Sequence, residues 1–423
     1  MTRMILQDAT IVDGDKPARR GDVVIAGERI EAVGPNAGVP RCGDRVVALG
    51  GRTVMPGMII GHYHAAYWEA GMGSAPLGLD APAALQAVRA ARNLKLALEC
   101  GFTGVIGAGG PNGIDACMKA AIAEGTIVGP RIMAGSRDVS STGHSSDMSF
   151  PSHWQIGAKG GLNRADGPDA FRRAVREEIK EGAEIVKIFA TNGHATGGDG
   201  SGWEISKDEF AAAVGAARER GAKARAHIAN RDAILYALDL GVHIIDHGDG
   251  LDEACIERIL EKGVYLAPSM YFPKVVMARM PGNPFTELMK LPYVEMAEIL
   301  PIANRAGVKL LLGDDYGAMG CSHGDYAREI ELYVNDVGIP ALDVIRWATK
   351  YGAEAMGLGD ETGTLEAGKL ADLVVVDGNP LKDITVLQDR SRILAVLKGG
   401  EAAVDALGQF EVRFEQAEAV AAE

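Results

Sequence analysis

Residues 54–64 read Val-Met-Pro-Gly-Met-Ile-Ile-Gly-His-Tyr-His, a short apolar segment that ends in two histidines. Side chains alternate between the two faces of a strand, so His62 and His64 point to the same side if the segment is extended. This is the first of eight short apolar strand candidates, and amphipathic helical stretches separate one from the next. The seven that follow are Thr103–Ala108, Arg131–Gly135, Ile185–Phe189, Lys223–Ala226, Val242–Asp246, Val264–Pro268 and Val308–Gly313.

This alternation predicts an α/β fold built on a (β/α)8 TIM barrel that covers residues 56–357. A doubly wound open sheet shows the same alternation of strands and helices, so this pattern alone does not distinguish the two folds. The helices expected between strands include Pro82–Cys100, Pro168–Glu181, Lys207–Arg220 and Asp252–Lys262.

Strand candidates also occupy both ends of the chain. Before the barrel they include Met4–Leu6, Ala9–Val12 and Asp22–Ile25, and after it Ala371–Asp377 and Ile393–Lys398. The residues Ala26-Gly27-Glu28 predict a tight hairpin between two of the early strands. We expect residues 1–55 and 358–423 to pair into one small β domain.

Composition and charge narrow the class of protein. The chain has 43 Lys and Arg against 57 Asp and Glu, and this net charge of −14 argues against nucleic-acid and anionic-membrane partners. The five cysteines form no CxxC pair, which predicts reduced thiols in the cytoplasm. Neither a signal peptide nor an apolar run of membrane-spanning length is recognisable. We therefore expect a cytoplasmic enzyme that acts on a small-molecule substrate.

Polar residues cluster at the ends of the predicted barrel strands. Lys187 lies inside the apolar run Ile185–Phe189, His227 and His247 end two further strands, and Asp314-Asp315 follow the last one. Each has a structural explanation taken alone: a core histidine, a chance His-x-His, a misplaced strand end or a helix cap. In a barrel, however, all these strand ends converge on one rim. Four imidazoles, a lysine and a carboxylate there supply enough ligands for two divalent ions.

These residues carry a resemblance to the amidohydrolase superfamily. The chain resembles the branch that includes imidazolonepropionase-like proteins, prolidase-type dipeptidases and ochratoxin-hydrolysing enzymes. The resemblance covers nearly the whole chain, from the strands before His62 to residues 363–374, Gly-Thr-Leu-Glu-Ala-Gly-Lys-Leu-Ala-Asp-Leu-Val. That last segment is typical of the composite β-sandwich domain of the superfamily, and the resemblance implies such a domain here.

The resemblance also implies a binuclear metal centre. His62 and His64 would bind the more buried ion, and His227 and His247 the more exposed one. Lys187, carboxylated by carbon dioxide, would bridge the two. The imidazole-rich ligand set favours zinc, although manganese and cobalt also suit these ligand types.

The strand-8 acid departs from the pattern of the family. Its Asp usually follows Gly-Thr, whereas this chain has Gly313-Asp314-Asp315. Alignment favours Asp315 as metal ligand and proton shuttle, and Asp314 stays an alternative. The reaction implied is attack of a metal-bridging hydroxide on a carbonyl, with the Asp passing the proton to the leaving amine.

Residues near the strand ends supply substrate-binding candidates. The resemblance gives His144, just beyond the third strand, a carbonyl-polarising or substrate-binding role, and a solvated loop histidine is the alternative. Tyr63 and Trp68 flank the first ligands and could form an aromatic wall, or simply pack. His323 and Arg231 lie after the last and fifth strands and could contact the substrate, Arg231 through a carboxylate. For His323 the alternative is a structural role in a loop, and for Arg231 it is a position at the start of a surface helix. His194, which follows the fourth strand, is interpreted as a structural loop residue.

The sequence favours hydrolysis of an amide-type C–N bond, as in an N-acyl amino acid, a dipeptide or an ochratoxin-like aryl amide. Carbamate, urea or lactone hydrolysis would use the same attack. A deaminase of this fold is disfavoured, because no Glu follows His227 closely and Lys187 is present. A non-catalytic metal-binding protein is disfavoured by the complete ligand set. Relatives are often oligomers, so we also expect a homo-oligomer.

Overall fold

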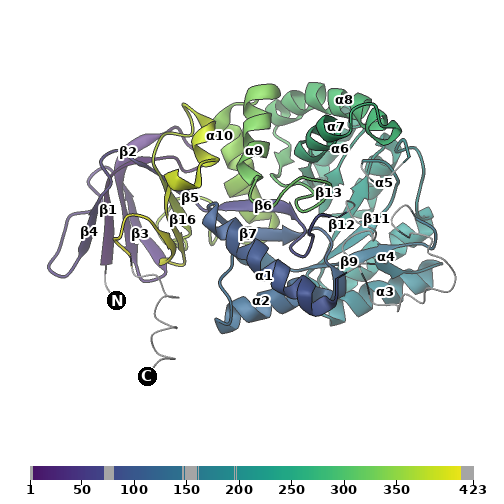
Figure 1. Cartoon of the computed structure of the whole chain (residues 1–423), viewed down its shortest axis with the longest axis horizontal. Coiled ribbons are helices and arrows are strands. Elements are labelled where there is room, and N and C mark those ends of the chain that lie inside the picture. The colour runs from purple at the N-terminus through teal and green to yellow at the C-terminus, as the bar shows by residue number, and fades with distance from the viewer. Residues whose placement is uncertain are drawn as a thin grey trace.

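The computed structural model describes residues 3–70, 81–144, 147, 160, 162–194, 196 and 198–410 (Figure 1). Residues 411–423 of the predicted β domain therefore lie outside the described part of the chain. Figure 1 shows a β-sheet unit at one end of the molecule and strands surrounded by helices at the other. Among the described residues, no helix is both long and apolar enough to span a lipid bilayer.

Two parallel sheets form the central part of the chain, one of three strands and one of seven. The first has the order β6-β7-β8 and the second the order β10-β9-β11-β12-β13-β14-β15. Their bounds are β6 (Met58–Tyr63), β7 (Phe102–Gly107), β8 (Arg131–Met133), β9 (Gly135–Ser140), β10 (Leu162–Arg164), β11 (Ile185–Phe189), β12 (Lys223–Ile228), β13 (Ile244–His247), β14 (Tyr265–Ala267) and β15 (Lys309–Leu310).

Every residue of β6, β7, β11 and β13 is buried, which explains their nearly continuous apolar sequences. Helices cover the outer faces of the strands (Figure 1). They are α1 (Ala83–Glu99), α2 (Ile114–Glu124), α3 (Pro168–Lys180), α4 (Lys207–Glu219), α5 (Arg231–Leu240), α6 (Glu253–Lys262), α7 (Tyr271–Arg279), α8 (Pro284–Ala306), α9 (Tyr326–Glu331), α10 (Ala341–Arg346) and α11 (Gly352–Ala355). The four helices expected from sequence end within a residue of these bounds.

The α/β class is confirmed, while the pairing of strands differs in detail from a single eight-stranded ladder. The predicted third strand is two strands, β8 and β9, separated at Ala134, whose carbonyl accepts from the Glu184 and Ile185 amides at 2.9 and 3.2 Å. At the other junction between the sheets, the Gly61 amide donates to the Leu312 carbonyl at 2.5 Å. Among the described residues, the hydrogen-bonded strands form two separate parallel sheets. Closure into a (β/α)8 barrel stays a prediction.

The end sheet is built from both ends of the chain. Its eight strands run β18-β17-β16-β5-β1-β2-β3, with β4 paired to β1. Their bounds are β1 (Arg3–Ile11), β2 (Arg19–Ala26), β3 (Arg29–Gly34), β4 (Arg45–Ala48), β5 (Thr53–Pro56), β16 (Leu373–Val376), β17 (Ile393–Lys398) and β18 (Glu401–Asp405). β5 joins the two halves, because it pairs with both β1 and β16. A sandwich arrangement and the domain limits stay predictions.

The first strand corrects one sequence expectation. Met4–Leu6 and Ala9–Val12 are not two strands separated by a turn, because β1 runs through both. Its register against β2 shifts between Leu6 and Ala9, and Asp8 adopts a φ of 59° there. An irregularity inside one strand therefore looked like a turn in the sequence. The predicted hairpin between β2 and β3 is confirmed.

Candidate metal centre

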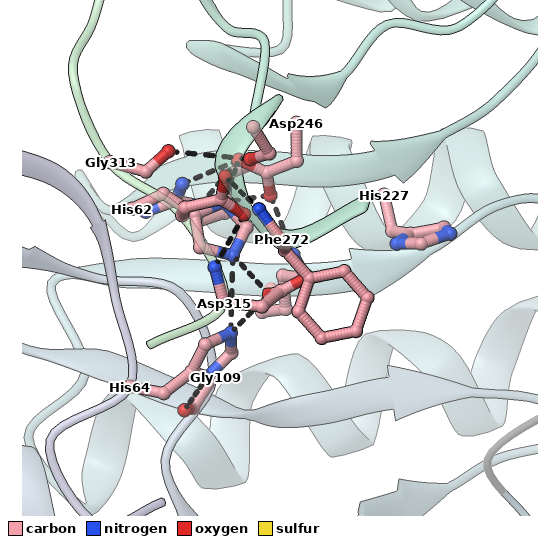
Figure 2. Close-up of polar contacts among 12 residues, drawn as sticks. His62, His64, Gly109, His227, Asp246, Phe272, Gly313 and Asp315 are labelled. Atoms are coloured by element: carbon pink, nitrogen blue, oxygen red, sulfur yellow. Dashed lines mark hydrogen bonds and ion pairs between the residues drawn. The ribbon is translucent and has the colours of Figure 1, made fainter. Parts of the chain in front are cut away.

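Side chains from β6, from β13 and from the segment after β15 meet in one cluster, in which Figure 2 shows His62, Asp246 and Asp315. His62 is in β6, His247 ends β13, and Asp315 follows β15. Each of these three offers a ligand atom, and the three atoms lie within 4.8 Å of one another. The structure thus contains a possible metal-binding group made of residues far apart in the sequence.

The tightest cluster is a triangle of ring nitrogens and a carboxylate oxygen. His62 Nε2 lies 3.1 Å from His64 Nε2 and 3.0 Å from Asp315 Oδ1, and the third side, His64 Nε2 to Asp315 Oδ1, is 3.2 Å. Tetrahedral zinc with bonds near 2.1 Å places its ligands about 3.4 Å apart. The three atoms are therefore spaced like ligands of one ion.

In both His62 and His64, the ring nitrogen Nδ1 has a hydrogen-bond acceptor beside it. His64 Nδ1 donates to the Gly109 carbonyl at 2.8 Å, and His62 Nδ1 lies 3.2 Å from Asp246 Oδ1. In a metal-bound state, with the proton on Nδ1, each Nε2 would offer its lone pair to an ion at the centre of the triangle in place of a hydrogen bond to Asp315. Such contacts fix ring orientation in many metal sites.

Asp315 rather than Asp314 faces these imidazoles. Asp314 is directed at the backbone, where its carboxylate accepts from the Phe272 amide at 2.9 Å and the Asp315 amide at 2.8 Å. Burial tends to raise the pKa of Asp315, but hydrogen bonds from His62 and His64 lower it well below its usual range. Asp315 is therefore ionised and available as a ligand.

His227 and His247 form a second group beside the first. Their ring centroids are 4.5 Å apart, and the His247 ring lies 5.2 Å from that of His62. Burial is the main cause that lowers the pKa of both well below the ordinary value, so both are neutral and able to bind a metal. His247 has a φ of 67°, a left-handed conformation that is costly for a histidine and concentrated at functional sites.

Lys187 lies at the base of the site in a buried ion-pair cluster. Its Nζ donates to Asp246 Oδ2 at 2.7 Å, and Arg225 Nε donates to the same oxygen at 3.0 Å. Both side chains of the Arg225–Asp246 pair are completely buried. Burial alone would raise the pKa of Asp246, but the adjacent Arg225 and Lys187 charges lower it well below its usual range.

Sequence reasoning missed Arg225 and Asp246, although one signal for them existed. Arg225 interrupts the apolar stretch Ala224–Ala226 just as Lys187 interrupts its own strand. An unpaired charge in a buried strand is costly, so such a residue implies a buried partner. The identity of the partner followed only from the register, in which Arg225 pairs with Ile244 on β13, two residues before Asp246.

Two further acids near the site were also missed. Asp138 on β9 is the register partner of Lys187, and burial raises its pKa to about 7. Its Oδ1 has no hydrogen-bond partner among the described residues. Asp249 pairs with His194 at 3.0 Å, and although burial would lower the pKa of His194, Asp249 raises it to about 9. The ring of His194 stacks on that of His247 at 3.9 Å. His194 therefore contacts a predicted metal ligand, in addition to its place in a loop.

Comparison with known proteins places this site in a family. The sequence model of the Amidohydrolase family matches residues 53–403. The chain belongs to the amidohydrolase family. This membership makes it a hydrolase, as the sequence predicted.

Individual relatives are similar over almost the full length. Ochratoxinase from Aspergillus niger is 28% identical over 419 residues, covering 94% of this chain and 86% of the relative, and its crystal structure superposes with a TM-score of 0.84. A prolidase solved with N-methylphosphonate-L-proline is 32% identical, with a TM-score of 0.83 and coverage of 95% and 99% of the two chains. A Xaa-Pro dipeptidase with bound methionine is 26% identical, with a TM-score of 0.82 and coverage of 95% and 99%.

The predicted substrate-binding residues of this amidohydrolase lie at different distances from the metal group. His144 is buried, with its ring 5.8 Å from that of Phe189, which stacks on His227 at 4.5 Å. Burial lowers the pKa of His144 to about 4, so its imidazole is neutral at physiological pH. His144 therefore lies one aromatic ring away from the predicted ligands.

The other predicted substrate residues are engaged elsewhere. The Tyr63 hydroxyl lies 3.3 Å from that of Tyr326, and His323 bonds the same Tyr326 hydroxyl at 3.1 Å. The Trp68 ring packs against the guanidinium groups of Arg89 and Arg92, at 5.3 and 4.8 Å. Arg231 is half exposed and donates to Asp252 and Asp232. The structure brings His62, His64, His247 and Asp315 into one group. His227 lies next to His247 but its Nε2 contacts the Gly193 carbonyl, and Lys187 is directed at Asp246. None of the four substrate-binding candidates of this paragraph joins that group.

Proposed function

We propose that this amidohydrolase hydrolyses an amide-type C–N bond of a small molecule in a centre that holds two divalent ions, zinc by preference. N-acyl amino acids, dipeptides and ochratoxin-like aryl amides are the substrate classes proposed. The observation that carries the proposal is the triangle of His62, His64 and Asp315, with two neutral imidazoles beside it. Similarity to an ochratoxinase and to prolidases supports amide cleavage.

The donor atoms present fit such ions. Imidazole nitrogens and carboxylate oxygens are ligands for zinc, and His247 Nδ1 is buried without a hydrogen-bond partner among the described residues. His62, His64 and Asp315 would hold one ion, and His227 and His247 the other. When bound, the ions supply Lewis-acid polarisation of the substrate carbonyl and make hydroxide available near neutral pH.

Lys187 fits the role of a carboxylated bridging residue. Its Nζ is buried beside Asp246, and carboxylation by carbon dioxide would replace the cation with an anion. Asp246 would then still be paired with Arg225, which donates to it from Nε and Nη2. Arg225 therefore keeps the Asp246 charge balanced in either state of the lysine.

Proton transfer falls to Asp315. Its carboxylate faces the predicted ligands and would accept the proton of the attacking water and return it to the leaving amine nitrogen. His144, neutral and close to the site, would donate a hydrogen bond to the substrate carbonyl or hold a substrate group. Both roles use the side chains in the protonation states that their environments favour.

Carbamate, urea or lactone hydrolysis is the second candidate, because the same attack on a carbonyl serves these substrates. Deamination ranks lower, since Ile228 and Ala229 follow His227 in place of a Glu. We also propose that residues 56–357 form one (β/α)8 barrel, and that the protein is a cytoplasmic homo-oligomer.

A substrate screen followed by liquid chromatography tests the proposed function. Amides of the three classes, ureas, carbamates and lactones are incubated with metal-loaded protein and with the Asp315→Asn variant. We expect an amide to be cleaved by the wild type and the Asn variant to be nearly inactive. Ammonia released from a cyclic amidine, with every amide intact, would overturn the assignment.

A further inference from the structure

A second cavity lies at the opposite end of the strands from the metal group. It has a volume of about 370 Å³, above the roughly 300 Å³ at which small-molecule sites begin. Arg131 begins β8 and Glu184 immediately precedes β11, and both residues line the cavity. His247 and Asp315 of the metal group, by contrast, lie at the end of β13 and after β15. A ligand in this cavity therefore leaves the metal group open to substrate.

The walls of the cavity come from the central sheets with their helices and from the end sheet. Lys398 ends β17 of the end sheet, and its Nζ donates to the Gly129 carbonyl, just before β8, at 2.7 Å. Small-molecule sites are frequent at such junctions. The apolar lining includes Ile122 of α2, Ile132 and Met133 of β8, and Met356 and Leu358 after α11. Methionine side chains adapt to irregular apolar shapes, so these walls suit a flexible alkyl chain.

The polar part of the lining carries an excess of positive charge. Three cations line the cavity, Lys119, Arg131 and Lys398. Among the described residues, Glu184 is the one acid that lines it. Asp372 offsets a second positive charge, because it accepts from Arg131 Nε at 2.7 Å and from Nη2 at 3.0 Å. A positive excess in a chain of net charge −14 favours an anionic group on the ligand.

Arg131 is the side chain best suited to bind that anion. Its contacts with Asp372 use Nε and Nη2, and Nη1 donates to no acceptor in the described part of the chain. The Arg131 side chain is 30% exposed, whereas that of Asp372 is completely buried. The guanidinium is therefore fixed by Asp372 and still accessible where Arg131 lines the cavity. A guanidinium held in this way loses little conformational freedom when it binds a carboxylate.

We propose that this cavity is a second binding site, which takes a carboxylate with an unbranched alkyl chain. Arg131 binds the carboxylate, and the chain lies along Met133 and Leu358. The proposal is independent of the proposed amide hydrolysis and of the metal centre. Each methylene buried against the apolar wall should tighten binding by up to about fourfold.

Calorimetric titration of the full-length, metal-loaded protein with octanoate, butanoate and octylammonium tests this site. Butanoate has the charge of octanoate on a shorter chain, and octylammonium has a long chain with the opposite charge. Ala120 and Ala123 are both exposed residues of α2, and of the two Ala123 lines the cavity. Ala123→Glu places a carboxylate in the wall without burying it in the core, and Ala120→Glu is the matched control.

We expect about one octanoate per chain, bound at least about tenfold more tightly than butanoate or octylammonium. Ala123→Glu should weaken octanoate binding by roughly tenfold or more through like-charge repulsion, and Ala120→Glu should leave it unchanged. Undetectable octanoate binding, equal affinities for the three ligands, or equal effects of the two variants would overturn the inference.

Carboxylates also bind metal ions, so the titration is repeated after the metal is removed with a chelator. Octanoate binding that survives this treatment and weakens in Ala123→Glu supports the cavity. Binding that disappears with the metal and persists in Ala123→Glu places the carboxylate at the metal centre and refutes the second site.

Discussion

Replacing Arg225 by Met removes one side of a completely buried ion pair. Arg225 donates from Nε to both oxygens of Asp246, at 3.0 and 3.2 Å, and from Nη1 to the Gly107 carbonyl at 2.9 Å. The substitution leaves the Asp246 carboxylate buried with Lys187 and His62 as its remaining partners. Breaking a buried pair from one side costs about 3–5 kcal/mol of unfolding free energy.

Calorimetry is the assay for this prediction. At an unfolding entropy of about 2.1 cal/mol/K per residue, the loss for a chain of 423 residues corresponds to a Tm lower by about 3–6 °C. The control is Arg172→Met, which removes an arginine from a solvent-exposed pair with Glu219 and should leave the Tm almost unchanged. The triple variant Arg225→Met/Asp246→Asn/Lys187→Met should recover part of the loss, because both buried pairs of Asp246 are then removed on both sides. Equal Tm values for Arg225→Met and Arg172→Met would refute the reasoning.

Three further predictions concern catalysis, pH and helix capping. Asp315→Asn should lower kcat/KM by about 10²–10⁴-fold with an unchanged far-UV circular dichroism spectrum, and full activity would exclude Asp315 as the base. Burial, with Lys223 nearby, lowers the pKa of His243 to about 4, below the value of about 6.5 expected in the unfolded chain. The unfolded state therefore binds more protons between these values, and the unfolding free energy should fall by up to about 1.4 kcal/mol per unit as the pH drops from 6.5 to 4. His243→Asn should flatten this slope in denaturant titrations, and an unchanged slope would contradict the assignment. Ser206→Ala removes the capping box at the start of α4 and should cost about 1 kcal/mol in the same titrations, whereas Ser206→Thr should retain most of it.

The sequence predicted the elements of the fold because their local signals are strong. Buried parallel strands are short apolar runs, and the helices between them have clear amphipathic patterns and caps. Their pairing is a tertiary property that such signals leave open. Ala134, which divides one expected strand into β8 and β9, has no side-chain feature that marks a break. Asp8 shows the converse, because a turn-forming residue lies inside one continuous strand.

In the candidate site, too, some residues were recognisable from the sequence, whereas the roles of others depend on the tertiary structure. His62, His64, His227 and His247 were recognisable because they end apolar strands, where a parallel fold gathers polar groups. The roles of Arg225, Asp138 and His194 depend on which strands are neighbours and on how loops return over the site. Asp138 resembles any other acid in the sequence until its register with Lys187 is known. Choosing between Asp314 and Asp315 likewise required the direction of each side chain.

Counting metal ions tests the central claim most directly. Wild-type protein prepared with ample zinc and bicarbonate is measured by mass spectrometry of the metals, beside Lys187→Ala and Lys223→Ala. Lys223 is the control because it lies in β12 at the opposite end of the strand from His227 and contacts His243. We predict about two ions per chain in the wild type and in Lys223→Ala, with at least one lost in Lys187→Ala. Fewer than one ion in the wild type, or an unchanged count in Lys187→Ala, would contradict a binuclear centre bridged by this lysine.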